Sequence, residues 1–197
     1  MIVSRETTGR LEVYKSMLQR WTHRINLVAP STLDDLEARH IKDSLQLTHL
    51  ASPEGGVWAD LGSGGGLPGL IIAIAFADRA TTFILVESDQ RKAAFLRAVV
   101  RETELTKVTV LSQRIEAVPP LNARYVSARA LAPLDELMAY LNLHLSSSGT
   151  AFLMKGRHWR TEVEEAMKAW SFDYTAHPSQ TQDGAAILEI SGVKHGA

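Results

Sequence analysis

The feature that most constrains the fold is a short apolar segment, residues 57–61, that leads directly into a glycine-rich stretch, residues 62–69. Glycine permits a tight turn from a strand into a helix, and it leaves bare backbone for a ligand to approach. The apolar residues 68–77 then predict a short helix. A strand, a glycine loop and a helix in this order indicate a βαβ unit of a parallel sheet, whose ligands bind at the carboxyl ends of the strands.

The alternation of apolar strands and amphipathic helices continues to the end of the chain. Strands that alternate with helices predict an α/β fold with a mostly parallel sheet and helices on both faces. We expect further strands at 82–87, 108–111, 125–128, 150–154 and 185–190, and helices at 91–101, 134–145 and 160–170.

The N-terminal part of the chain has helical patterns instead. Apolar residues recur at helical spacing from Leu11 to Trp21, and Ser31 is a candidate N-cap for a second helix over 33–45. A turn-rich segment follows and marks a boundary. We therefore predict a helical appendage over residues 1–52 and one compact domain over residues 53–197.

Composition excludes several kinds of chemistry. The 197 residues include no cysteine, which excludes disulfides, thiolate zinc sites and a cysteine nucleophile. The seven histidines show no metal-ligand spacing, so we expect no metal. No apolar run approaches the roughly 18 residues needed to cross a bilayer, and we see no secretory signal. We expect a cytoplasmic protein, not bound to membranes, and a monomer.

Charge is unevenly distributed along the chain. The formal net charge of −1 argues against a strongly basic nucleic-acid binder. Between residues 88 and 130, however, Lys and Arg exceed Asp and Glu by eight to four. A local basic face would suit a polyanionic substrate, whereas the alternative is a set of ordinary solvated helix faces. Charge alone leaves both readings open.

The positions of the glycines distinguish two kinds of nucleotide site. Residues 64–69 match the dinucleotide fingerprint G-x-G-x-x-G as a string, but that fingerprint should begin where the strand ends, at Gly62. Counted from Gly62, its third glycine would fall on Leu67. The spacing D-x-G-x-G-x-G from Asp60 is instead typical of class I, Rossmann-like methyltransferases, which have a seven-stranded sheet and bind S-adenosylmethionine. A purely structural glycine turn is the third alternative.

Two carboxylates are candidates for the same nucleotide site. Asp60, at the end of the first strand, can organise the glycine loop and the ammonium group of the cofactor's methionine part. Glu87 follows the second strand, where a carboxylate can accept hydrogen bonds from ribose hydroxyls. NAD sites use the same device, so Glu87 indicates a nucleoside ligand without separating these two cofactors.

A series of motifs in a fixed order connects the chain with a known family. The motifs are Asn26-Leu27, His40-x-x-Asp43-Ser44-Leu45, the glycine loop, Glu87-Ser88 with Arg91-Lys92, Arg114-Ile115-Glu116, Ser127-Ala128-Arg129-Ala130 and Lys155-Gly156. With them the chain resembles the RsmG (GidB) family, which methylates N7 of a guanine in bacterial 16S ribosomal RNA. The resemblance implies S-adenosylmethionine as cofactor, 16S ribosomal RNA or the small ribosomal subunit as partner, and guanine 527, in the 530 loop, as target.

The resemblance also implies roles for individual residues. The candidate catalytic residues are Arg129, Asp43 and His40. The candidate RNA contacts are Arg91, Lys92, Arg114 and Lys155. The candidate cofactor-binding residues include the two carboxylates above. They are Asp60, Gly62, Gly64, Leu67, Glu87, Ser88, Asp89, Ile115, Glu116 and Arg129.

Two parts of the chain depart from the family. The family has an Asp shortly before the Arg129 motif, in a position that is Arg124 here, so we expect no carboxylate at that point of the fourth strand. Residues 160–190 match poorly, and no role is transferred to them.

The residues also agree with methylation of a ring nitrogen. Methylation at C5 of a pyrimidine needs a cysteine nucleophile, and the chain has none. Methylation of an exocyclic amine typically uses an Asn/Asp-Pro-Pro-aromatic segment, whereas Pro119-Pro120 is flanked by aliphatic residues. Guanine N7 has a free lone pair and no proton, so alignment of the reactants can supply the catalysis without a general base.

We hypothesise that Arg129 and Asp43 hold the guanine, with Asp43 accepting from its Watson–Crick edge. By spacing alone, His40 and Asp43 also suit a helix face that packs on the domain, and the cations suit an ordinary solvated surface. Two functional alternatives stay open: a Rossmann-like module that binds NAD, and a methyltransferase that acts on another RNA or on a small molecule.

Overall fold

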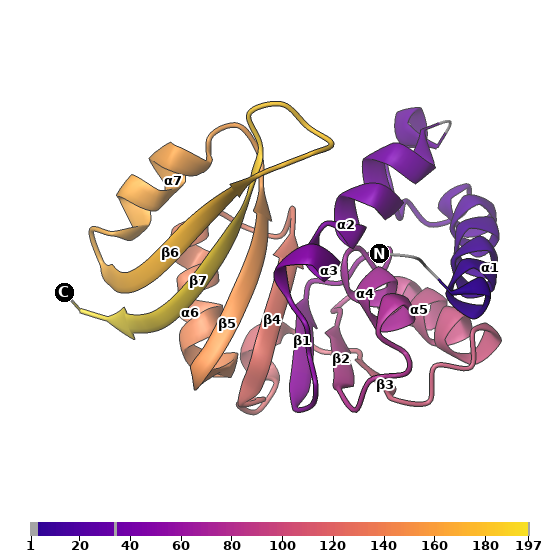
Figure 1. Cartoon of the computed structure of the whole chain (residues 1–197), viewed down its shortest axis with the longest axis horizontal. Helices are drawn as coiled ribbons and strands as arrows, with labels where there is room; N and C mark the ends of the chain where they lie inside the picture. Colours follow the sequence, from indigo (N-terminus) through magenta and orange to yellow (C-terminus); the bar gives the residue numbers. More distant parts are fainter. Residues whose placement is uncertain (1–3, 34, 197) are drawn as a thin grey trace.

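The computed structural model describes residues 4–33 and 35–196. Within them, seven strands form a single sheet in the order β3-β2-β1-β4-β5-β7-β6 (Figure 1). Neighbouring strands from β3 to β5 pair in parallel, whereas β7 is antiparallel to both β5 and β6. This confirms the predicted α/β fold with a mostly parallel seven-stranded sheet. The strands are β1 (Val57–Leu61), β2 (Thr82–Val86), β3 (Val108–Leu111), β4 (Ala123–Arg129), β5 (Leu145–Lys155), β6 (Trp170–Pro178) and β7 (Ala186–His195).

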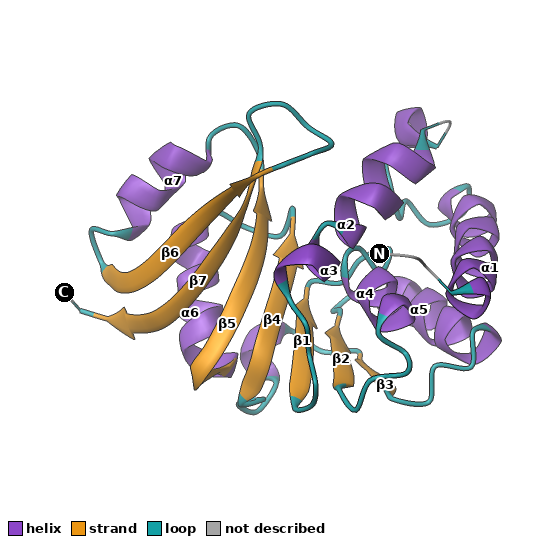
Figure 2. Cartoon of the chain, viewed as in Figure 1, coloured by secondary structure: helices purple, strands orange, loops and turns teal. Residues whose placement is uncertain are grey.

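Helices cover both faces of the sheet, as predicted (Figure 2). On one face, α4 (Gly69–Ala75) and α5 (Gln90–Glu102) bury apolar side chains in a cluster that includes Trp58 of β1. On the other face, α6 (Leu134–His144) and α7 (Trp159–Ala166) enclose a second buried cluster. All four of these helices lie on the faces of the sheet, and in open α/β sheets ligands bind at the carboxyl edge of the parallel strands.

The N-terminal segment completes the first of these two clusters. The long helix α1 (Arg5–Thr22) is followed by short helical turns, and its Tyr14 and Leu18 are fully buried beside α4 and α5. None of the described helices is both long and apolar enough to cross a membrane. The short turns are η1 (Pro30–Thr32), η2 (Glu37–Lys42), α2 (Asp43–Leu45) and α3 (Leu47–Leu50).

The predicted helix over 33–45 with Ser31 as its N-cap is wrong. Ser31 lies inside the 3₁₀ turn η1, because Pro30 occupies the first position of that turn and starts it earlier. The next helical segment, η2, begins only at Glu37 and is a π-helix, a wide turn that is frequent at functional sites. His40 lies within it, and Asp43 follows directly.

The C-terminal part differs from the prediction in two ways. The helix predicted over 160–170 ends at Ala166, and Trp170 begins the unpredicted strand β6. In β6 only Trp170 and Phe172 are buried, because the strand lies at the edge of the sheet. The apolar alternation that would reveal a strand is therefore too short to recognise in the sequence.

Candidate active site

Two hollows meet at the carboxyl edge of the parallel strands. The first, which we call the loop cavity, has a volume of about 470 Å³ and lies over the ends of β1 and β2. The second, which we call the cleft, has a volume of about 700 Å³ and lies between the N-terminal segment and the β6–β7 loop, residues 179–185. Arg129 and Ala130, at the end of β4, line both hollows.

The glycine loop forms one wall of the loop cavity. Gly62 has a φ of +67°, and a Cβ atom added there would lie 2.5 Å from Leu131 Cδ1. Glycine at this point therefore gives both the turn and the bare backbone that a ligand needs. Gly62, Gly64 and Leu67 all line the cavity, and because β1 ends at Leu61, Leu67 occupies the position of the third glycine of a dinucleotide site.

Glu87 ties together the loops that follow β1 and β2. Its Oε2 accepts a hydrogen bond from the Gly64 N–H at 2.8 Å, and its Oε1 accepts one from the Asp89 N–H at 2.7 Å. Glu87 and Ser88 line the cavity. Asp89 is not among the lining residues: it caps α5, and its hydrogen bonds with Arg91 and with the start of the helix lower the pKa of its carboxyl to about 2.

Asp60 lies behind the glycine loop rather than in the cavity. Its carboxylate is 1 % exposed and accepts a hydrogen bond from the Ser127 hydroxyl at 2.6 Å. Burial raises the pKa of the Asp60 carboxyl to about 6. A Cβ atom on Gly69 would lie 2.5 Å from Asp60 Oδ2, so the start of α4 packs directly against this carboxyl group. Asp60 is therefore in a position to organise the loop, without direct access to a ligand.

A residue of the N-terminal segment supports the loop from the other side. The fully buried Tyr14 hydroxyl donates a hydrogen bond to the Gly65 carbonyl oxygen at 2.8 Å. In the sequence, Tyr14 is visible only as a member of an apolar helical pattern. Its polar end was the available signal, because a buried tyrosine hydroxyl nearly always has a hydrogen-bond partner.

The far end of the loop cavity carries a group of polar side chains around Ile115. Ile115 and Glu116 line this end, as do Glu136 and Tyr140, which the sequence did not single out. The Tyr140 hydroxyl lies 2.9 Å from Glu116 Oε1 and 2.9 Å from Glu136 Oε1. A hydroxyl has one hydrogen to donate, so one of these two carboxylates keeps acceptor capacity for a ligand.

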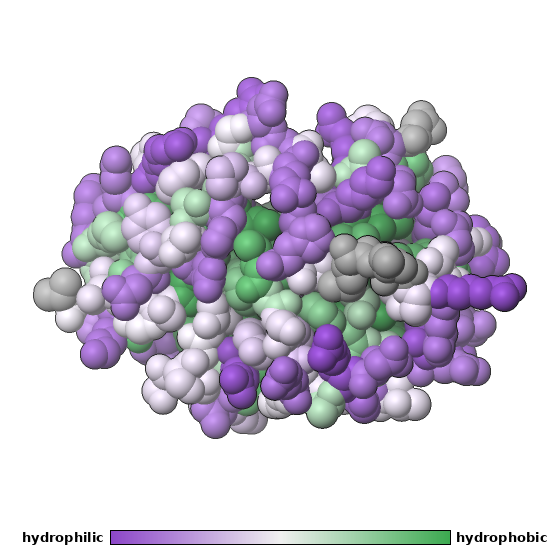
Figure 3. Space-filling model, viewed as in Figure 1, coloured by the Kyte–Doolittle hydropathy of each residue, from purple (hydrophilic) through white to green (hydrophobic). Residues whose placement is uncertain are grey.

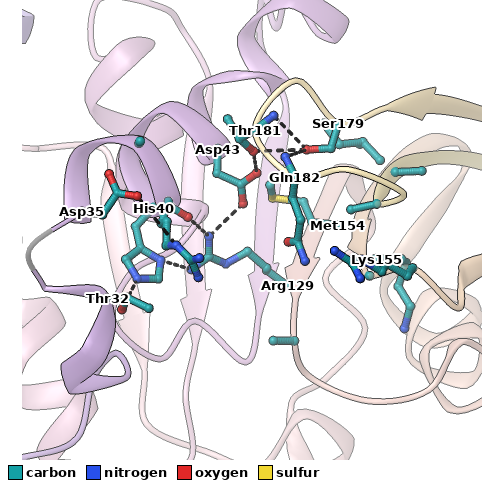
Figure 4. Close-up of a pocket in the computed structure, with 18 of the residues that line it drawn as sticks. Thr32, Asp35, His40, Asp43, Arg129, Met154, Lys155, Ser179, Thr181 and Gln182 are labelled. Carbon is teal, nitrogen blue, oxygen red and sulfur yellow. Dashed lines mark hydrogen bonds and ion pairs between the residues drawn. The ribbon is translucent and has the colours of Figure 1, made fainter.

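Arg129 joins the sheet to the N-terminal segment. Its Nη1 donates to Asp43 Oδ2 at 3.0 Å, and its Nη2 lies 2.8 Å from His40 Nδ1 (Figure 4). Burial, and then the Arg129 charge, lower the pKa of His40 to about 4. His40 is therefore neutral near pH 7, so Nδ1 accepts from Arg129 and the Nε2–H donates to Thr32 Oγ1 at 2.8 Å. The three candidate catalytic residues thus form one hydrogen-bonded group.

The other oxygen of Asp43 connects this group to the β6–β7 loop. Asp43 Oδ1 accepts hydrogen bonds from Gln46 Nε2 and from the Thr181 hydroxyl. Gln46 Oε1 in turn accepts from the Gln180 N–H at 2.6 Å. The loop is thereby fixed against the N-terminal segment across the cleft. The sequence assigned no role to Gln46 or to this loop, and no local pattern identifies them.

The candidate RNA contacts are divided between different places. Lys92 and Arg114 line the loop cavity, whereas Arg91 lines neither hollow and pairs with Asp89. Lys155 lines the cleft, but its ammonium is 2.5 Å from Glu162 Oε2 and its side chain is 9 % exposed. Lys155 is thus already neutralised. The exposed Arg157, two residues further on, also lines the cleft and was not predicted.

The basic stretch between residues 88 and 130 does not form one face. β4 runs from Ala123 to Arg129, so Arg124 lies at the opposite edge of the sheet from Arg129, near Gly56. The absence of a carboxylate at position 124, expected from the sequence, therefore has no bearing on the site. Pro119-Pro120 also precedes β4 and lines neither hollow. Among residues 4–33 and 35–196 there is no group of three or more acidic or histidine side chains placed to hold a metal ion.

The fold has close counterparts among solved structures. A methyltransferase from Aquifex aeolicus described as dependent on S-adenosylmethionine matches with a TM-score of 0.62 and 12% identity, over 89% of this chain and 97% of that one. Fibrillarin from Aeropyrum pernix, solved with natively bound S-adenosyl-L-methionine, matches with a TM-score of 0.56 and 15% identity, over 78% and 74%. At these identities the likeness concerns the fold. The sheet order, the glycine loop and the cavity above it define a class I, Rossmann-like methyltransferase.

Sequence comparison identifies the family within this class. The family model for rRNA small subunit methyltransferase G (GidB) matches residues 7–187, and the chain belongs to this family. A relative in Paracoccus denitrificans, named Ribosomal RNA small subunit methyltransferase G, is 55% identical over 99% of this chain and 100% of its own length. A relative of the same name in Ruegeria sp. is 50% identical over 98% and 94%. The resemblance found in the motifs is thereby confirmed.

Proposed function

We propose that this chain transfers a methyl group from S-adenosylmethionine to N7 of a guanine in 16S ribosomal RNA, at guanine 527 in the 530 loop. The observation that carries the proposal is the position of Arg129, which lines both the loop cavity and the cleft. A methyl donor in the first hollow and a base in the second would meet beside this side chain. Such an enzyme would work in the cytoplasm, where ribosomal subunits assemble.

The loop cavity fits the parts of the methyl donor. The backbone at Gly62 and Gly64 suits the methionine end, the Glu87 carboxylate suits ribose hydroxyls, and Ile115 with Glu116 suits an adenine. Bound there, S-adenosylmethionine supplies an electrophilic methyl group on a cationic sulfonium. Asp43 neutralises Arg129, so the guanidinium does not oppose a second cation nearby.

The junction of the two hollows suits an acceptor atom that needs no deprotonation. His40 has both ring nitrogens in hydrogen bonds, and Asp43 has both oxygens in hydrogen bonds. Neither of the two side chains bonded to Arg129 is therefore placed as a free general base. The N7 lone pair of guanine requires none, so the residues of the junction contribute by alignment and by excluding water.

The cleft has the shape and lining for a base. Apolar residues such as Met154 and Ile187 lie among its lining, and the space-filling view is hollowed between the β6–β7 loop and the N-terminal segment, with apolar residues inside and hydrophilic ones around them (Figure 3). In this proposal Arg129 and Asp43 hold the guanine. Asp43 would contact it through Oδ2, which accepts only the Arg129 hydrogen bond and has a second lone pair, whereas Oδ1 already serves both Gln46 and Thr181.

The experiment is transfer of a tritiated methyl group from S-adenosylmethionine to three pools: small ribosomal subunits, naked 16S ribosomal RNA and small metabolites. We expect label in the ribosomal RNA of the first or second pool. Label confined to metabolites would contradict the RNA substrate. Calorimetry that detects binding of NAD but not of S-adenosylhomocysteine would contradict the methyl donor.

A further inference from the structure

The polar side chains that line the cleft are, with one exception, already engaged with one another. Thr32 and His40 are bonded together, as are Arg129 and Asp43, and Lys155 and Glu162. Asp35 pairs with Arg39, Arg157 donates to the Asp183 carbonyl oxygen, and the hydroxyls of Ser179 and Thr181 are hydrogen-bonded within their loop or to Asp43. Of the lining residues that the structure describes, only Gln182 has a polar side chain with neither a hydrogen-bond partner nor an ion-pair partner.

The backbone at Gln182 is nevertheless held firmly in place. The N–H groups of Thr181 and Gln182 both donate to the Ser179 hydroxyl at 3.2 Å. The same loop is fixed to the N-terminal segment through Gln46 and Asp43. Figure 4 shows the Gln182 side chain pointing from this loop into the cleft, in the direction of Arg129. The Gln182 amide, which has no partner in the protein, is therefore held at the cleft by a fixed turn.

We propose that Gln182 reads the acceptor base, a role that rests on the proposed function. A glutamine amide offers one acceptor oxygen beside an NH₂ donor. Guanine offers O6, an acceptor, beside N1–H, a donor, and the two groups are complementary in a pair of hydrogen bonds. This contact leaves N7 free for the methyl group. The exocyclic amino group of the same edge is left for Asp43, and Gln182 supplies the contact to O6 and N1–H.

The test combines a protein variant with a base analogue. Small subunits are reconstituted with ligated 16S ribosomal RNA that carries guanine, inosine or 2-aminopurine at the target position. Inosine keeps O6 and N1–H, whereas 2-aminopurine has neither. Initial rates of methyl transfer are measured for the wild-type chain and for Gln182→Ala. For each protein, the rate with guanine or inosine is divided by the rate with 2-aminopurine. Differences in the reactivity of N7 itself cancel when this ratio is compared between the two proteins.

We expect the wild-type chain to prefer guanine and inosine over 2-aminopurine, and Gln182→Ala to lose about tenfold or more of that preference, the scale of a paired base contact. Affinity for S-adenosylhomocysteine should stay the same, since Gln182 does not line the loop cavity. The matched control is Gln180→Ala, which changes an exposed neighbour outside the cleft and keeps its backbone bond to Gln46.

Three outcomes would overturn the inference in distinguishable ways. An unchanged base preference in Gln182→Ala, with an active wild-type chain, removes the role of Gln182 and leaves the proposed function intact. A wild-type chain that methylates none of the three RNAs removes both. An equal loss of preference in Gln180→Ala would assign the effect to the loop and not to the Gln182 amide.

Discussion

Among single residues, Arg129 is the one on which the site depends. It stands at the end of a central strand, yet both of its side-chain partners come from the N-terminal segment, Asp43 being 86 positions away. The sequence motifs indicated Arg129, His40 and Asp43 separately. Their hydrogen bonds to one another were not predictable, because no spacing in the chain records which distant groups the fold brings together.

The charge of Asp43 gives a first prediction. Asp43→Asn keeps the size and one acceptor oxygen but leaves the Arg129 guanidinium without its counter-ion, beside the place proposed for a sulfonium. We expect affinity for S-adenosylmethionine to fall by about tenfold. Affinity for S-adenosylhomocysteine, which lacks the positive sulfur, should fall much less. Calorimetry with both ligands provides the comparison, and an equal loss for the two would rule out the charge argument.

His40 gives a prediction about pH. Its folded pKa of about 4 lies below the unfolded value of 6.5, so between these values the unfolded chain binds a proton that the folded chain does not. This histidine therefore makes stability fall as the pH drops from 6.5 towards 4, and it has no such effect above 6.5. Asp60, with its raised pKa, acts in the opposite direction below about pH 6.

A comparison with His40→Gln isolates the histidine, since Asp60 is common to both proteins. In urea unfolding at pH 7.5 and pH 5, we expect the wild-type chain to lose more stability on acidification than His40→Gln does. Parallel losses in the two proteins would mean that His40 keeps an ordinary pKa in the folded state.

Among the helices and strands, those that carry a short apolar run were predicted most accurately from the sequence. β1 and β3 have the predicted bounds, because short apolar runs flanked by turns are readily recognised. The edge strand β6 and the π-helical turn η2 were missed. Neither has a local signal: β6 buries few side chains, and in η2 only Ile41 is buried. η2 lines the cleft directly, and β6 leads into the β6–β7 loop that lines it from the other side.

The glycine loop gives a prediction for an element. Gly62→Ala places a Cβ atom 2.5 Å from Leu131 Cδ1 at a φ of +67°, so the loop or the cavity wall must shift. We expect about tenfold weaker binding of S-adenosylhomocysteine, since a left-handed non-glycine residue costs roughly 1–2 kcal/mol. The control is Gly9→Ala in α1, where no atom lies within 4 Å.

Gly9→Ala should bind S-adenosylhomocysteine normally and unfold at slightly higher urea, because alanine favours an exposed helix by up to about 1 kcal/mol over glycine. Calorimetry and urea unfolding measure both properties in both variants. Normal ligand binding by Gly62→Ala would show that the left-handed turn is not needed for the cofactor site.

For the whole molecule, the buried cluster on one face of the sheet belongs to the N-terminal segment as much as to the sheet. Tyr14 and Leu47 lie in the same cluster as Trp58 and Ile71. We propose that residues 1–52 and 53–197 unfold together despite their separate patterns. Hydrogen exchange in increasing urea should give α1 and β1 the same unfolding midpoint. Earlier exchange in α1 would indicate an independent unit.

The loop cavity and the cleft differ in how much of each could be predicted from the sequence. The loop cavity is built largely from strand-end loops, each of which carries its own motif, and most of its candidate residues line it. The cleft is assembled from three distant parts of the chain: the N-terminal segment, the ends of β4 and β5, and the β6–β7 loop. Charge counted along the sequence was equally uninformative, because the fold spreads those cations over opposite edges of the sheet.

The central claim is that Arg129 brings a methyl donor and guanine N7 together. Borohydride reduction followed by aniline cleaves RNA at N7-methylguanosine, so this treatment of 16S ribosomal RNA, after incubation of unmethylated subunits with the enzyme and S-adenosylmethionine, tests the claim most directly. We predict one new cleavage, at guanine 527, with the wild-type chain, and at least about a hundredfold slower appearance with Arg129→Ala. Methyl label in the RNA without cleavage, or cleavage at an equal rate with Arg129→Ala, would contradict the claim.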